Sequence, residues 1–93
     1  MYKVNDYVLT TEEDPKRSRW LYKSKILKIE GDNISILDMY SYNKKARTVT
    51  KEDYTREVNT RNPSVIHKDC ILQKVPRNFI FDGFQSTHPE YFL

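Results

Sequence analysis

The sequence predicts a small, mainly β protein whose short strands close into a barrel. Three observations support this fold class. The chain has only 93 residues, several short segments alternate apolar and polar residues, and no stretch has the longer period of an amphipathic helix. Aromatic residues make up 13% of the chain, so disorder is not expected. Closure into a barrel would remove the exposed edges that four or five short strands otherwise present.

The N-terminal segment predicts one strand followed by a charged loop. Residues 4–9 place a polar pair between apolar residues, which is typical of a short strand entered through a turn. Residues 10–19 contain an acidic block, Pro15 and a basic block. This composition predicts an exposed loop.

Residues 20–39 predict a long β-hairpin. Residues 20–29 form the strongest predicted strand, and the period of two divides its side chains between two faces. One face carries Trp20, Tyr22, Ser24 and Ile26, and the other carries Lys23 and Lys25. Leu27 and Ile29 then change the parity of the apolar positions, which indicates a β-bulge near Leu27. A turn at 31–33 leads into the alternating strand 34–39.

The second half predicts shorter elements. We expect a polar, aromatic connection at 40–45, an edge strand at 47–50, a loop that can include a helical turn at 51–62, a 3₁₀ turn at 67–69 and a last short strand at 70–72. Pro76 ends this unit. We therefore expect a barrel over residues 1–76 and an aromatic C-terminal extension, 77–93, that packs back on the barrel.

The apolar positions of these strands predict the core. It would consist of Val4, Val8, Leu9, Ser24, Ile26, Leu27, Ile29, Ile34, Ile36, Val49, Ile71 and Leu72.

Composition limits the cellular setting. The net charge of +3 permits anionic partners without demanding them. The single cysteine, Cys70, excludes an internal disulfide and fits a reducing compartment. No apolar run approaches the roughly 20 residues that span a bilayer, so we expect no membrane partner.

Two stretches resemble a known family. In residues 8–26 a Val-Leu strand end precedes an acidic-Pro-basic loop and then Leu21-Tyr22, a small residue and Lys25-Ile26. This order resembles the opening of the chromo-barrel domain in male-specific-lethal and mortality-factor proteins. Residues 40–45, in which aromatic residues precede Asn43 and two lysines, are similar to a segment of the chromo-barrels in MYST-type acetyltransferases. The strand-bend-strand pattern is shared with Tudor domains.

The resemblance implies a five-stranded, SH3-like barrel in a nuclear chromatin protein. Many members hold a methylated histone lysine in an aromatic cage, where ring faces attract a cation that has lost hydrogen-bond donors. Tyr22 matches one cage position, and Tyr40 or Tyr42 matches others. Tyr7, Trp20 or the tail aromatics would have to complete the cage, because residues 46–50 lack the tryptophan of the family. Asp38 could supply a carboxylate.

Two other functions compete with this interpretation. A nucleic-acid-binding barrel would use basic side chains interleaved with aromatic ones. These are Lys16, Arg17, Arg19, Lys23, Lys25, Lys28, Lys44 and Lys45, with Arg47 nearby. A scaffold covered by its own tail would instead dock other subunits of a chromatin complex.

Catalysis is not expected. His67, Asp69 and Cys70 are close in sequence, but a turn rarely brings an imidazole and a thiol together with a third orienting group. Two histidines and one cysteine do not complete a typical zinc site. We therefore expect no catalytic residue, no metal and no cofactor.

Overall fold

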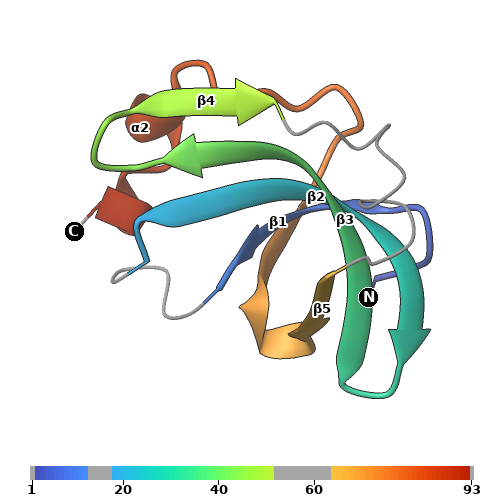
Figure 1. Cartoon of the computed structure of the whole chain (residues 1–93). Helices are drawn as coiled ribbons and strands as arrows, with labels where there is room; N and C mark the ends of the chain where they lie inside the picture. Colours follow the sequence, from blue (N-terminus) through green and yellow to red (C-terminus); the bar gives the residue numbers. More distant parts are fainter. Residues whose placement is uncertain (1, 13–17, 52–63, 93) are drawn as a thin grey trace.

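The computed structural model describes residues 2–12, 18–51 and 64–92. Six strands make one antiparallel sheet (Figure 1): β1 Tyr7–Thr11, β2 Trp20–Glu30, β3 Asn33–Asn43, β4 Thr48–Lys51, β5 Ser64–His67 and β6 Ile71–Val75. Three short turns complete the described chain: the 3₁₀ helix η1 Lys68–Cys70, the helix α2 Phe84–Thr87 and the 3₁₀ helix η2 Pro89–Phe92. The mainly β prediction is confirmed, with six strands where five were expected.

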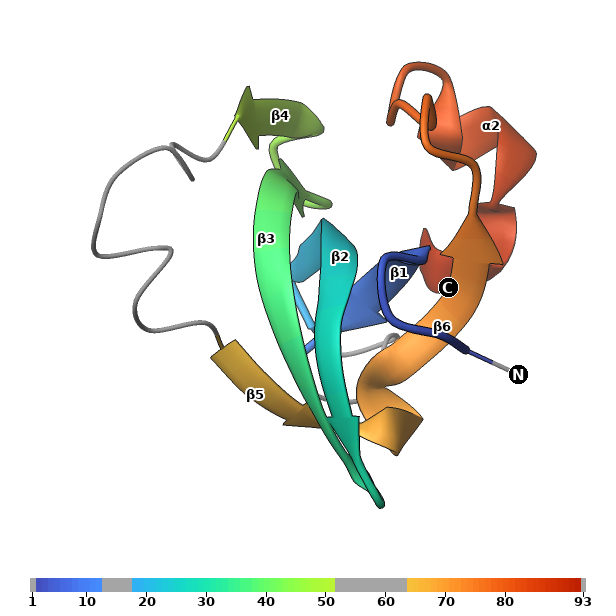
Figure 2. The same ribbon diagram turned by 90° about the vertical axis from the view of Figure 1, so that its right-hand side faces the viewer.

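The sheet is strongly curled but open. Its order is β4-β3-β2-β1-β6, and β5 pairs with β3 at residues 33–36, beyond the pairing of β3 with β4 at 40–43. Only the three residues of η1 separate β5 from β6, although these strands pair at opposite edges of the sheet. Figure 2 shows them on either side of the β2–β3 hairpin. The connection brings the two edges towards each other at this end.

Two register shifts bend the β2–β3 hairpin. Ile26 pairs with Ile36 and Lys28 with Ser35, so Leu27 is the extra residue, which confirms the predicted bulge. The second shift was not predicted. Lys23 pairs with Tyr40 and Ser24 with Asp38, which leaves Met39 as an extra residue on β3.

The Met39 bulge decides which face each side chain occupies. Directly paired residues of antiparallel strands point to the same face. Tyr40 therefore shares a face with Lys23, and Asp38 shares the opposite face with Ser24. Each face carries a buried cluster, so the protein has two cores rather than the single core expected.

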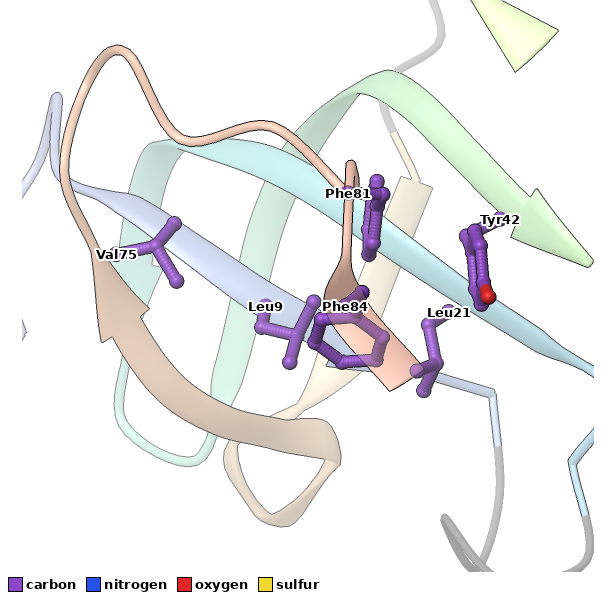
Figure 3. Packing of buried hydrophobic residues seen from close by; sticks show 6 residues of the cluster. All are labelled: Leu9, Leu21, Tyr42, Val75, Phe81 and Phe84. Atoms are coloured by element: carbon purple, nitrogen blue, oxygen red, sulfur yellow. The ribbon is translucent and has the colours of Figure 1, made fainter. Parts of the chain in front are cut away.

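The first core fills the concave interior of the sheet. It contains Val8, Ile26, Ile34, Ile36 and Ile71, with Tyr2 and Ile66 packed against it. The second core lies between the opposite face and the aromatic tail (Figure 3), and it contains Leu9, Leu21, Tyr42, Val75, Phe81 and Phe84. Leu21, Tyr42 and Val75 were missed, because the sequence does not show which strand face the tail covers.

Three predicted core residues are wrong. Val4 is 49% exposed, Ile29 39% and Val49 47%. Val4 lies in a turn, where Asn5 has φ of 76° and the Lys3 N–H donates to Asp6, so β1 begins only at Tyr7. Ile29 lies at the end of the hairpin, and Val49 lies on the exposed strand β4. Leu27 and Leu72 are half-buried.

Some predicted loops are ordered strand instead. Thr10 and Thr11 belong to β1 and are buried. Ser18 lies just before β2 and is also buried, and its hydroxyl donates to the Trp20 carbonyl. The connection expected at 40–45 is strand as far as Asn43. The expected 3₁₀ turn and edge strand are confirmed as η1 and β4, and the last strand runs on to Val75. The helical turn expected within 51–62 falls almost wholly outside the described residues.

Candidate functional site

Lys23 joins the sheet to the tail. Its side chain is almost fully buried, and its Nζ donates to the carbonyls of Arg77, at 2.6 Å, and Phe79, at 3.0 Å. The same Nζ lies 5.3 Å from the ring centre of Tyr7 and 5.6 Å from that of Tyr40. The ammonium group of this buried lysine thus lies over two tyrosine rings, and cation–π attraction adds to its two hydrogen bonds.

Burial lowers the pKa of the Lys23 ammonium below its ordinary value of 10.5. Between the lowered pKa and 10.5, the unfolded chain binds more protons at this site than the folded chain does, so stability contributed by Lys23 rises with pH across that interval. We therefore expect the free energy of unfolding of the wild type, relative to Lys23→Met, to be constant below the lowered pKa and to increase between that pKa and pH 10.5. Urea titrations of both proteins at each pH would measure it. A constant difference would contradict the expectation.

A cleft opens beside Lys23. It has a volume of about 420 Å³ and lies between the β1–β2–β3 face and the loop 77–80. Its basic lining residues are Lys23, Lys25 and Arg77, and its aromatic ones are Tyr7, Tyr40 and Phe79. Leu37, Met39, Asn78 and Ile80 complete it. No acidic side chain of the described residues lines this cleft.

A second, more apolar pocket adjoins the cleft. Its volume is about 230 Å³, and it is lined by Tyr40, Val49, Phe79, Ile80, Phe81 and Asp82. Tyr40, Phe79 and Ile80 line both cavities. We call the two together the tail groove, with the cleft as its basic end and the second pocket as its aromatic end.

The four aromatic residues predicted for a cage do not come together. Trp20 and Tyr22 pair with Asn43 and Ser41 on one face, whereas Tyr40 and Tyr42 pair with Lys23 and Leu21 on the other. The Met39 bulge separates them, since an uninterrupted register would have kept Tyr40 on the face of Asp38. Tyr42 is 4% exposed and stacks on Phe81 with ring centres 5.0 Å apart. Of the four, only Tyr40 lines the tail groove.

Asp38 and Tyr22 make local polar contacts. The Ser24 hydroxyl donates to Asp38 Oδ1 at 2.7 Å and lies 3.0 Å from Thr10 Oγ1. The Tyr22 hydroxyl donates to Glu12 at 2.7 Å. Asp38 therefore belongs to a part-buried chain of polar groups on the face that the tail groove does not occupy.

The predicted basic strip is dispersed. Lys23 binds the tail, and Lys44 Nζ donates to the Tyr91 carbonyl at 2.8 Å. Lys28 pairs with Glu30, which raises the pKa of Lys28. Arg19, Lys45 and Arg47 are exposed, and Lys25 lines the tail groove. Lys16 and Arg17 lie outside the described residues. Two lysines expected to contact nucleic acid thus hold the tail instead.

His67 has a structural role at the start of η1. Its Nδ1 accepts the backbone N–H of Asp69 at 3.1 Å, which caps the turn. Among the described residues, no group of three or more histidine, cysteine or acidic side chains could hold a metal ion.

Comparison with known protein families, curated proteins and solved structures found no match. The chromo-barrel resemblance therefore stays a prediction. Within the described ranges, no helix has the length and apolar character needed to cross a membrane.

Proposed function

We propose that this chain is a non-catalytic, SH3-like barrel module of a nuclear, chromatin-associated protein, and that it binds a methylated lysine of a histone tail or similar basic peptide. The aromatic end of the tail groove carries this proposal. Tyr40, Phe79 and Phe81 line it together with one carboxylate, Asp82, and without a basic residue. Aromatic faces and one carboxylate are what a methylammonium group needs.

The site differs from the one expected from the sequence in where its walls originate. Tyr40 comes from β3, and the other two aromatic residues come from the tail. In the proposed site the tail aromatics, one of the alternatives that the sequence left open, replace Trp20 and Tyr22 as walls. The short η1 connection between the opposite edges of the curled sheet supports the barrel assignment.

An amide NMR titration with histone-tail peptides tests the proposal. Each lysine is supplied unmodified, trimethylated and as a neutral analogue with a tert-butyl group in place of the trimethylammonium. We expect shifts centred on Tyr40, Phe79 and Asp82 with the trimethylated peptide and weaker binding of the neutral analogue. Equal binding of the neutral analogue, or no binding by any peptide, would contradict the proposal.

Replacing the carboxylate gives the matching prediction. Asp82→Asn should weaken trimethyl-lysine binding about two- to fivefold, the usual worth of an exposed charge pair, while leaving the fold unchanged because Asp82 is exposed. Asp69→Asn, an exposed aspartate on η1, is the control and should bind as the wild type. Isothermal calorimetry of the three proteins measures the difference. Equal affinity of Asp82→Asn and wild type would show that Asp82 does not contribute to binding.

A further inference from the structure

The basic end of the tail groove carries charge that its surroundings do not neutralise. Lys23, Lys25 and Arg77 line it. Ion pairs recorded within the described residues involve neither Lys25 nor Arg77. Lys25 is half-buried and Arg77 exposed, so solvent reaches both. Three cationic groups around one cleft favour an anion.

The aromatic rings that line the basic end are less accessible to a ligand than its charged side chains. The Lys23 ammonium lies over the rings of Tyr7 and Tyr40. A base or another flat ligand stacking there would have to displace a lysine that also holds two backbone carbonyls. Arg77, Lys25 and Asn78 are therefore the polar lining residues of the cleft that remain for a ligand. A guanidinium binds phosphate in a bidentate manner.

The two ends of the groove are close enough for one ligand. They share Tyr40, Phe79 and Ile80 as lining residues. A peptide whose lysine enters the aromatic end would run past the basic end within a few residues. A second basic side chain there would meet like charge, whereas an anionic one would be attracted.

We infer that the basic end binds the phosphate of a phosphorylated serine or threonine located a few residues from the lysine on the same peptide. The inference rests on the proposed function for its peptide, and it adds a second determinant of specificity. A phosphate carries about −1.5 to −2 charges and three acceptor oxygens. It therefore matches several cationic groups better than the single carboxylate of a peptide Asp or Glu would.

The first test uses inorganic phosphate alone, at constant ionic strength against chloride. We expect saturable NMR shifts at Lys25, Arg77 and Asn78, and their loss in Arg77→Gln. Arg47→Gln, another exposed arginine, is the control and should respond as the wild type. Shifts spread over all surface lysines, or retained in Arg77→Gln, would overturn the inference. This test does not involve the aromatic end, so it can succeed even if trimethyl-lysine binding fails.

The second test uses trimethyl-lysine peptides with serine, glutamate or phosphoserine at positions one to four residues from the lysine. We expect phosphoserine to strengthen binding about tenfold at its best position, in line with one or two new charge-assisted hydrogen bonds. Arg77→Gln should remove most of this gain and change binding of the serine peptide less than twofold. Equal gains from glutamate and phosphoserine would overturn the inference. So would tighter binding of a short duplex DNA through the same residues.

Discussion

Replacing Phe84 by alanine is expected to lower the free energy of unfolding by about 3–5 kcal/mol, the usual cost of removing a buried phenyl ring. Phe84 is 2% exposed. Its ring lies edge-on to Tyr42, with centres 5.5 Å apart, and stacks on His88 at 4.6 Å. The cavity would open in the second core, between the sheet and the tail.

Thermal unfolding followed by circular dichroism measures this effect. In a domain of this size, 1 kcal/mol corresponds to about 4–8 °C in Tm, so Phe84→Ala should unfold well below the wild type. Ile80→Ala is the matched control, since Ile80 is also in the tail but 66% exposed. It should change Tm little. Similar losses in both variants would show that Phe84 does not anchor the tail.

Replacing Lys23 by alanine is expected to cost about 2–4 kcal/mol and to loosen the loop 77–80. The substitution removes a buried side chain and leaves the carbonyls of Arg77 and Phe79 without their donor, and each part-buried carbonyl left unpaired costs about 1–3 kcal/mol. Lys23→Met keeps most of the side-chain volume and removes only the ammonium. We expect the free energy of unfolding of Lys23→Met to lie between those of Lys23→Ala and the wild type.

Limited trypsin digestion reports on the loop directly. The Arg77 carbonyl belongs to the peptide bond that trypsin cleaves, so losing its hydrogen bond should speed cleavage after Arg77. Cleavage after Lys45, in the exposed β3–β4 turn, serves as the internal reference in the same digest. An unchanged ratio of the two rates in both Lys23 variants would mean that Lys23 does not hold the loop.

The hairpin was predictable because its sequence changes parity where the chain bulges. Leu27 and Ile29 break the alternation that begins at Trp20, and the structure places the extra residue at Leu27. The Met39 bulge left no such mark. Ile34, Ile36, Asp38, Tyr40 and Tyr42 alternate without interruption, so the pattern predicts one face where the structure has two.

The site was predictable only in part for the same reason. Tyr40 was identified as a candidate, but its partners Phe79, Phe81 and Asp82 lie some forty residues later. The aromatic composition of the tail predicted that it packs back on the sheet. Which strand face it covers depends on Leu21 and Lys23. Both are buried, although the sequence pattern places Lys23 on the face opposite the predicted core.

The pairing of β1 with β6 has a consequence for synthesis of the chain. Tyr7 pairs with Val75 and Thr10 with Ile71. More than sixty further residues must therefore be synthesised before β6, one of the two neighbours of β1, is available for pairing. Such long-range pairing slows folding, because the loop-closure entropy is lost before the contacts form. Leu9 also requires Phe81 and Phe84 to cover it. On the ribosome, the growing chain would therefore expose an apolar N-terminal strand until translation has passed the tail, and chaperones have that interval in which to bind it.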